Sequence, residues 1–149
     1  MTETDATEVI VKKKKKRKTG VNTKSKKKTA VARAVIKKGT GKIKVNKKLL
    51  ETIEPKVVRK FIAEPLVLAG DLAKEVDISV NTSGGGFMGQ AVAIRSAIAK
   101  ALISIRKNDK LKEKFLNYDR LLLVDDPRKK EAKKPLGPSA RAKKQKSKR

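Results

Sequence analysis

Residues 76–106 read VDISVNTSGGGFMGQAVAIRSAIAKALISIR, and this stretch decides the fold. Apolar residues alternate with polar ones over residues 76–82, which predicts a strand with one buried face. The glycine run at 84–86 ends the strand, and an apolar stripe at helical spacing then predicts a long helix from about Met88 to Arg106. The stripe consists of Ala91, Ile94, Ile98, Ala101, Leu102 and Ile105, with Ser96, Lys100 and Lys107 expected to face outward.

On the N-terminal side of this stretch, the sequence predicts a second strand over residues 31–36. The glycines of residues 39–41 predict a turn into a return strand at 43–45, and Asn46 is expected to cap a short helix. A further helix is expected to begin at Pro55. Pro65 should interrupt it, because the residue before a proline avoids the helical region.

On the C-terminal side, Asp109 is expected to cap a short helix that carries Leu111 and Phe115. Residues 121–124, LLLV, fit a fully buried final strand. The prolines and lysines after Asp126 predict no regular structure. The expected fold class is therefore α+β, a single mixed domain in which a small sheet packs on helices.

Charge is concentrated at the two ends of the chain. The 149 residues include 41 Lys and Arg against 15 Asp and Glu, for a formal charge of +26. Residues 12–48 hold eighteen bases and no acid, residues 49–126 are nearly neutral, and residues 127–149 hold eleven bases and one acid. We therefore expect a disordered basic N-terminal extension (1–28), a globular core (29–126) that begins near Thr29, and an extended basic C-terminal arm (127–149).

The composition also excludes several classes of function. The absence of cysteine removes disulfides and thiolate chemistry, and the absence of histidine removes the commonest general base and metal ligand. No metal, cofactor or small-molecule substrate is expected. The N-terminus shows no signal peptide or lipidation pattern, and no apolar run approaches the length of a membrane span, so no membrane partner is expected.

Two motifs could suggest catalysis. The glycine run between a strand and a helix could cradle a nucleotide phosphate, but it lacks the spacing and the lysine of a P-loop. An RNA phosphate or a plain turn explains it as well. Asp125 and Asp126 are adjacent in sequence and should point apart, so they are expected to cap the exit of the arm or to balance nearby lysines.

Lysine runs within proline-spaced tails are best explained by a polyanion, because neutralising phosphates releases their counterions. The chain has four aromatic residues, Phe61, Phe87, Phe115 and Tyr118, and three of the four fall in predicted helices rather than on a sheet face. We therefore expect binding led by phosphates and shape, with little reading of single-stranded bases.

Short motifs in a fixed order reveal a family resemblance. They include KTAVA at 28–32, GKIKVN at 41–46, LETIEP at 50–55, GGG at 84–86, GQA at 89–91, AIR at 93–95, YDR at 118–120, DPR at 126–128 and QKSKR at 145–149. From about Lys26 to Arg149 the chain resembles the universal small-subunit ribosomal protein nine family, in its archaeal and eukaryotic form, which eukaryotes number sixteen. It departs from the family at Lys144, where an aromatic residue is frequent, and at Lys47, where glycine is usual.

The resemblance implies a structural, non-enzymatic and cytoplasmic constituent of the ribosome, packed on ribosomal RNA (rRNA) in the head of the small subunit beside neighbouring head proteins. It also implies that the C-terminal tip contacts the peptidyl-site tRNA through Lys146, Ser147, Lys148 and Arg149. The residues expected to bind rRNA are Lys26, Lys27, Lys28, Arg33, Lys42, Lys44, Gly84, Gly85, Gly86, Gln90, Arg95, Arg128, Lys129, Lys130, Lys133, Lys134, Arg141, Lys143 and Lys144. Residues 1–25 exceed the usual family N-terminus and could form an extra rRNA-binding arm.

Two other classes of function remain as alternatives. Basic tails around a neutral core would also serve a general nucleic-acid packaging protein, and the glycine run would serve a nucleotide-dependent enzyme. Equal affinity for duplex DNA and rRNA would favour the first alternative, and saturable nucleotide binding would favour the second.

Overall fold

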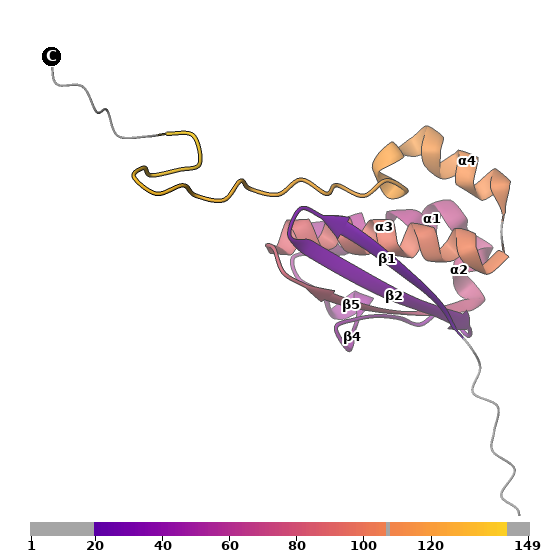
Figure 1. Ribbon diagram of the computed structural model, residues 1–149. Helices are drawn as coiled ribbons and strands as arrows, with labels where there is room; N and C mark the ends of the chain where they lie inside the picture. The colour runs from indigo at the N-terminus through magenta and orange to yellow at the C-terminus, as the bar shows by residue number, and fades with distance from the viewer. Residues whose placement is uncertain (1–19, 107, 143–149) are drawn as a thin grey trace, which may run out of the picture.

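A five-stranded sheet with helices packed on one face forms the body of the protein (Figure 1). The structure is a computed structural model that describes residues 20–106 and 108–142. Its strands are β1 (Val21–Lys27), β2 (Ala30–Lys38), β3 (Ile43–Val45), β4 (Lys48–Leu49) and β5 (Val76–Ser83). Its helices are α1 (Lys56–Ala69), α2 (Asp71–Lys74), α3 (Phe87–Arg106) and α4 (Asp109–Tyr118), with short 3-10 turns η1 (Leu50–Thr52) and η2 (Arg120–Leu122). The expected α+β class is confirmed.

The sheet order is β1-β2-β5-β3-β4, so the strand that was clearest in the sequence lies at its centre. β2 pairs antiparallel with β1 and β5, whereas β3 pairs parallel with β5. The sequence predicted that residues 31–36 and 43–45 pair with each other in a hairpin. That prediction is wrong, because β5 lies between β2 and β3. A pairing that is distant in the sequence leaves no local signal.

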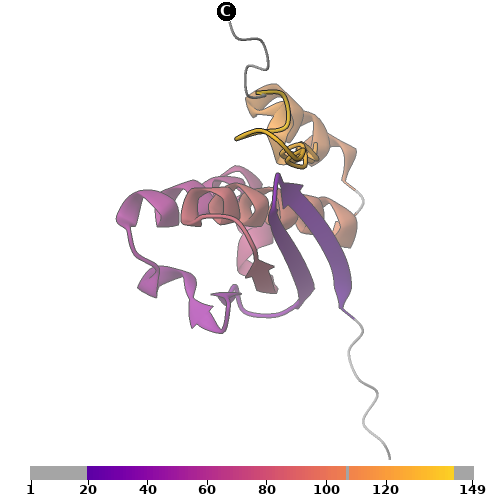
Figure 2. The ribbon, with the colours of Figure 1, turned by 60° about the vertical axis from the view of Figure 1, so that its left-hand side comes forward.

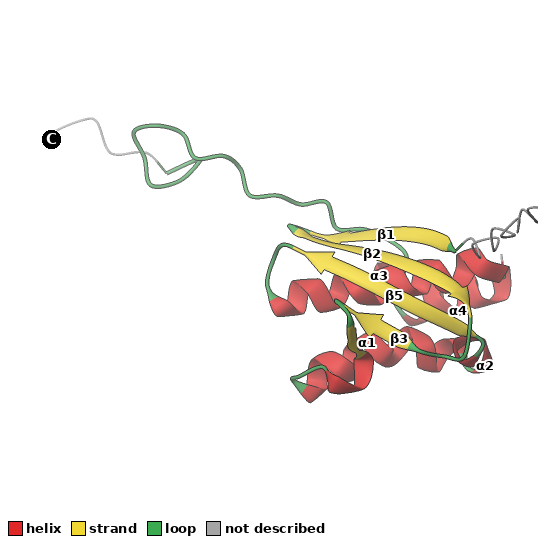
Figure 3. Cartoon of the chain, turned by 90° about the horizontal axis from the view of Figure 1, so that it is seen from below, coloured by secondary structure: helices red, strands yellow, loops and turns green. Residues whose placement is uncertain are grey.

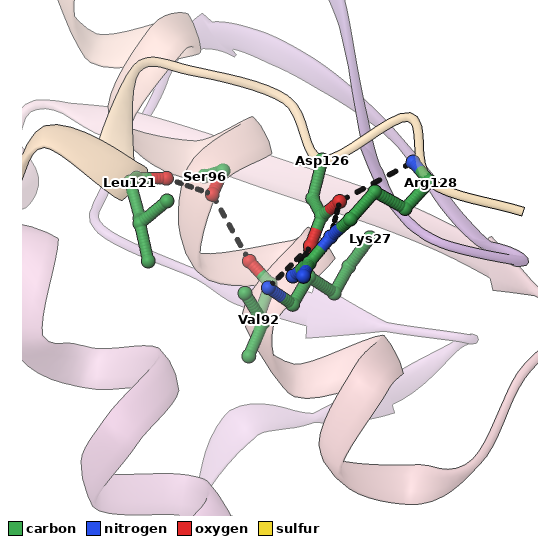
Figure 4. Close-up of polar contacts among 6 residues, drawn as sticks. All are labelled: Lys27, Val92, Ser96, Leu121, Asp126 and Arg128. Carbon is green, nitrogen blue, oxygen red and sulfur yellow. Dashed lines mark hydrogen bonds and ion pairs between the residues drawn. The ribbon is translucent and has the colours of Figure 1, made fainter.

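Helix α3 is the core helix, and it is buried on more than one side. It packs against β1, β2 and β5 on one side and against α1 and η2 elsewhere. Ser96 is buried and donates its hydroxyl to the carbonyl oxygens of Val92, at 3.1 Å, and Leu121, at 2.8 Å (Figure 4). The expectation that Ser96 faces outward is wrong, because η2 covers that side of the helix.

By length and composition alone, α3 would be long and apolar enough to cross a membrane. Ten of its residues are buried inside the domain, however, and the core helix of a globular fold meets the same criteria.

Strand β1 begins eight residues before the expected start of order at Thr29, so that boundary is wrong. Its inward face is largely polar: Val21 packs on the core, but Thr23 donates its hydroxyl to the carbonyl oxygen of Ala97 at 3.0 Å, and Ser25 is fully buried. Hydrogen bonds to α3 and to the C-terminal segment take the place of most of the hydrophobic burial, and three of the seven residues of the strand are lysines. A search for apolar alternation could not find this element.

Helix α1 continues through Pro65 and ends at Gly70, whose φ is +60°. The expected interruption at Glu64-Pro65 is wrong. Pro65 is buried, and tertiary packing of α1 against α3 outweighs the backbone hydrogen bond that proline cannot donate. The N-terminal boundary at Pro55 agrees with the expectation.

Asn46 does not cap a helix. Asn46 and Lys47 both have positive φ, at +46° and +70°, and form the tight turn between β3 and β4. The side chain of Asn46 exchanges two hydrogen bonds with Thr82 of β5, of 2.8 and 2.9 Å. This turn adopts left-handed backbone at Lys47 with a lysine in place of the usual glycine.

The last predicted strand is also wrong. Residues 120–122 form η2, in which Asp119 accepts a hydrogen bond from the backbone of Leu121 and Leu122 alone is buried. Within the described residues, 127–142 contain no helix or strand, and they run away from the domain (Figure 1). In the turned view of Figure 2 the same residues overlap α4. Residues 1–19 and 143–149 lie outside the described part of the chain, and with them most of the expected N-terminal extension and the tip of the arm.

Candidate nucleic-acid interface

Within residues 20–106 and 108–142, no segment covers the face of the sheet opposite the helices, which we call its open face (Figure 3). Ala32, Ala34 and Ile36 of β2 are buried on the helix side, so the alternate residues of the strand point to the other side. In an antiparallel pair, residues directly opposite each other share a face. The register therefore places Lys24 of β1 beside Arg33 of β2, and Lys26 beside Val31, on the open face.

The open face is strongly basic. It carries Lys24 and Lys26 from β1, Arg33 and Lys37 from β2, and Lys44 from β3. Across β5 it continues through the small polar residues Ser79, Asn81 and Ser83. We call this surface the basic sheet face. Val31 and Val35 of β2 lie between these groups on the same face. A surface rich in cations and small polar groups suits a phosphate backbone, which needs charge and close approach rather than an apolar pocket.

Asp77 is the acid on this face, and its role is local. Its carboxylate accepts the backbone N–H groups of Thr40 and Lys42, each at 2.9 Å, and so closes the turn after β2. These two hydrogen bonds lower the pKa of Asp77 below its ordinary value. This closed turn holds Lys42 at the edge of the basic sheet face.

The first two residues of the glycine run lie against the turn between β1 and β2. Gly84 has a φ of +74°, and a Cβ there would lie 2.6 Å from the carbonyl oxygen of Thr29. Gly85 has a φ of +67°, and its Cβ would lie 3.0 Å from that of Ala30. Gly86 meets nothing within 4 Å. Close backbone packing is therefore sufficient to explain two of the glycines. Gln90 reinforces the loop by donating to the carbonyl oxygen of Gly84 at 3.1 Å.

The two adjacent aspartates hold the base of the arm against the end of β1. Asp126 forms a 2.8 Å ion pair with Lys27 and a two-pronged contact with Arg128 (Figure 4). Asp125 accepts hydrogen bonds from Ser25 at 2.6 Å and from Lys100 at 2.5 Å. We call these contacts the arm clasp. They confirm the expectation that the two carboxylates balance lysines where the arm leaves the domain.

Both carboxyl groups of the arm clasp are held in the charged form. Hydrogen bonds from Arg128 and then Lys27 lower the pKa of Asp126 far below its ordinary value. For Asp125, burial alone would raise the pKa, but hydrogen bonds from Lys100, Ser25 and the backbone of Lys26 outweigh it and the pKa is lowered.

Beyond the clasp, the arm presents the exposed cations Lys129, Lys130, Lys133 and Lys134, and Arg128 within the clasp is exposed as well. Arg141 is also exposed and pairs with Glu131 at 2.7 Å, which folds the arm back on itself locally. Lys143, Lys144 and the four expected tRNA-contacting residues lie outside the described part of the chain.

Arg95 does not belong to any exposed basic surface, and the expectation that it binds rRNA needs correction. Its side chain is only 7% exposed and forms ion pairs of 2.7 Å with Glu64 and with Asp119. Its guanidinium carbon also lies 4.5 Å from the ring centre of Phe61 and 5.9 Å from that of Tyr118. Arg95 therefore joins α1, α3 and the end of α4 inside the fold.

The structure thus brings most of the expected positions into two neighbouring areas. Lys26, Arg33, Lys42 and Lys44 lie on or beside the basic sheet face. Lys27, Lys28, the glycine run and Arg128 gather near the turn between β1 and β2 and the arm clasp. The expected set omitted Lys24 and Lys37. The sequence could have indicated Lys37, because Lys37 and Arg33 are four residues apart on a predicted strand and therefore lie on the same face of it.

Comparisons with known proteins identify the family of the chain. The family model of ribosomal protein S9/S16 matches residues 25–149. The chain is 52% identical over 122 residues to the small ribosomal subunit protein uS9 of Pyrobaculum aerophilum, covering 82% of this chain and 86% of the relative. It is 47% identical over 129 residues to the small ribosomal subunit protein uS9 of Methanococcus maripaludis strain C5, covering 85% of this chain and 96% of the relative.

These relatives carry the names of ribosomal proteins and not of enzymes, which agrees with the expected absence of catalysis. The match spans strands, helices and arm alike, and its start at residue 25 lies within β1. The family resemblance found in the sequence motifs is confirmed: this chain belongs to the ribosomal protein S9/S16 family.

Proposed function

We propose that the chain is a ribosome-bound, cytoplasmic structural constituent of the small ribosomal subunit. In this proposal the basic sheet face and the arm bind rRNA of the subunit head, where other head proteins lie beside the domain. The C-terminal tip contacts the peptidyl-site tRNA.

The observation that carries the rRNA part of the proposal is the basic sheet face itself. Its cations come from three strands, and they share one face only because the register of the sheet aligns them. The known relatives named as small-subunit proteins supply the class of RNA. Phosphates held by many converging cations give an affinity that depends strongly on salt, but the shape of a folded RNA adds a component that salt does not remove.

The arm clasp supports the tRNA part of the proposal. An extended arm reaches a distant target efficiently only if its exit is fixed, because a freely pivoting base adds conformational entropy that binding must then remove. The ion pair between Lys27 and Asp126 and the contacts of Asp125 fix that exit. The residues proposed to touch tRNA are Lys146, Ser147, Lys148 and Arg149, all outside the described residues.

Gradient fractionation of a cell lysate after a high-salt wash tests the proposal. The full chain should remain in the small-subunit peak, whereas a variant with Arg33→Ala and Lys44→Ala should be released at lower salt. A matched control with Lys56→Ala and Lys60→Ala on α1 removes the same charge from the opposite side of the sheet and should behave as the parent. Release of the parent chain into the soluble fraction would instead favour the packaging alternative.

A further inference from the structure

A groove separate from the basic sheet face lies between the β3–β4 hairpin, α1 and the start of α3. Its volume is about 440 Å³. Its floor is made of buried core side chains, among them Val58, Ile62 and Ala91. Its rim carries Lys48 from the hairpin and Phe87 and Gln90 from α3. We call it the Phe87 groove. Its size lies within the range of about 300–1,000 Å³ typical of sites for small ligands.

Phe87 is unusual among the aromatic residues of the chain, all four of which lie in the described part. Phe115 is fully buried, while Phe61 and Tyr118 flank the guanidinium of Arg95, with Tyr118 54% exposed. Phe87, the first residue of α3, remains 67% exposed at the rim of the groove. An exposed aromatic ring beside an apolar floor offers a flat partner the stacking surface that proteins use for unpaired bases.

One cation, Lys48, and one acid, Glu54, line the groove. The adjoining hairpin of residues 43–49 carries three lysines and no acid, so the charge around the groove still favours an anionic occupant. Lys48 lies opposite Val45 in the hairpin, so it shares the helix-side face of that strand and reaches the groove. On the other face of the same strand, Lys44 belongs to the basic sheet face. The hairpin therefore carries cations on both sides, and an RNA strand that follows the basic sheet face would meet the groove as it passes the hairpin.

We propose that the Phe87 groove binds an unpaired nucleobase of RNA, stacked on the ring of Phe87, with Lys48 on the adjoining phosphate. The inference rests on the proposed function, because it requires RNA beside the domain, and it adds a contact to a base where the sheet supplies contacts to phosphates. It also amends the expectation of little reading of single-stranded bases. Phe115 is buried and Phe61 and Tyr118 lie against Arg95, so Phe87 is the aromatic side chain that the proposal concerns.

Binding of two short RNA probes by the full chain tests the proposal. One probe is a single-stranded ribohexamer of mixed sequence, and the other is an RNA duplex of similar charge. The basic arms bind both probes through phosphates, so the ratio of the two affinities isolates contacts to an unpaired base. Phe87→Ala should lower affinity for the single-stranded probe by about 5- to 150-fold and leave the duplex unaffected.

Three companion variants sharpen the experiment. Phe87→Tyr keeps the ring and should retain parental affinity. Val57→Ala, at an exposed apolar position of α1 outside the groove, should change neither affinity. Lys48→Ala should reduce the dependence of log affinity on log salt for the single strand by about 0.7, the loss expected for one phosphate contact. Phe87→Ala should leave this salt dependence unchanged.

A Phe87→Ala variant that weakens both probes equally, or neither, overturns the groove assignment, and the second result would point to a protein side chain as the occupant. That failure stays distinct from failure of the proposed function. If the Arg33→Ala and Lys44→Ala variant still leaves the subunit at lower salt, rRNA binding by the sheet stands without the groove.

Discussion

The Nζ atom of Lys27 lies 2.8 Å from Oδ2 of Asp126, although the two residues are 99 positions apart in the chain. The backbone reinforces this contact, because Lys28 donates its N–H to the carbonyl oxygen of Asp126 and Asp126 donates to that of Lys26. The last core residues thus form a parallel bridge beside the end of β1. The bridge brings the N-terminal strand and the root of the C-terminal arm to one point of the molecule.

The arm clasp predicts a specific loss of stability in acid. Because the folded-state pKa values of Asp125 and Asp126 are lowered, the clasp contributes its full stabilisation above the unfolded-state pKa of about 4 and loses it as pH falls toward the folded-state values. A variant with Asp125→Asn and Asp126→Asn should be less stable than the parent at pH 7. Its melting temperature should also fall less between pH 7 and pH 3.

Thermal unfolding at the two pH values measures this difference. Glu113→Gln, at an exposed position of α4, provides a control that should keep the parental dependence on pH. An equal drop in melting temperature for the double variant and the parent would show that the clasp is not formed in solution.

The glycine run predicts a contrast between neighbouring positions. Gly84→Ala should destabilise the fold by about 1–3 kcal/mol, because it combines a positive φ with a close approach to the carbonyl oxygen of Thr29. Gly86→Ala should reduce the stability of the fold much less than Gly84→Ala, since a Cβ at residue 86 would meet open space. Urea unfolding compares the two variants, and equal effects would contradict the close packing of the loop on the β1–β2 turn.

The elements that could be predicted from the sequence are those with a complete local pattern. Strand β5 alternates and α3 carries a stripe, so both appeared where expected. Strand β1 was missed because its inward residues, Thr23 and Ser25, are polar and gain their stability from hydrogen bonds to distant groups. The continuation of α1 through Pro65 was missed because packing against α3, which is remote in the sequence, overrides a local preference.

The residues of the candidate interface also divide into those that a local pattern indicates and those that depend on distant contacts. Charge runs indicated the RNA-binding class, and the parity of strand residues could have placed Arg33 with Lys37. The sequence did not separate Arg95 from the surface cations, because the single apolar stripe of this helix indicates only one buried face. Helix α3 has a second buried side, and the acids that pair with Arg95 come from α1 and from the residue after α4.

Arg95 predicts a change in stability without a change in binding. Arg95→Met leaves Glu64 and Asp119 without their cation, and because these two carboxylates are partly exposed we expect a loss of about 2–3 kcal/mol. The same substitution at the exposed Arg33 should alter stability by less than about 0.5 kcal/mol but reduce the salt dependence of RNA binding. Urea unfolding and salt titration of rRNA affinity separate the two effects. A loss of salt dependence in Arg95→Met at full stability would return Arg95 to the RNA-binding set.

The basic sheet face predicts a role for two lysines that motif analysis did not select. Lys24→Ala and Lys37→Ala should each weaken rRNA binding and reduce the slope of log affinity against log salt by about 1. Lys60→Ala, on the exposed side of α1, is the matched control. The slope is the sharper readout, because it reports phosphate contacts independently of any change in the shape of the protein. Slopes that are unchanged in both variants would confine RNA binding to the arm.

The tip of the arm predicts a separation between assembly and tRNA binding. A variant with Lys148→Ala and Arg149→Ala should assemble into the small subunit normally, because the basic sheet face and the arm clasp are intact. Its subunits should retain peptidyl-site tRNA less well, since two cations that can contact phosphate are gone. Retention of labelled tRNA on purified subunits measures the effect.

A second double variant, which removes two positive charges nearer the domain, tests whether tRNA retention depends on the position of the cations or on the total charge of the arm. Lys129→Ala with Lys130→Ala removes the same two charges close to the clasp, where the arm is exposed but only just leaving the core. This variant should lose rRNA affinity and salt resistance while its assembled subunits retain tRNA as the parent does. If both variants lose tRNA equally, the arm acts as a diffuse cationic tail and the tip has no site of its own. Failure of the tip variant to assemble would mean that residues 146–149 serve rRNA packing instead of tRNA contact.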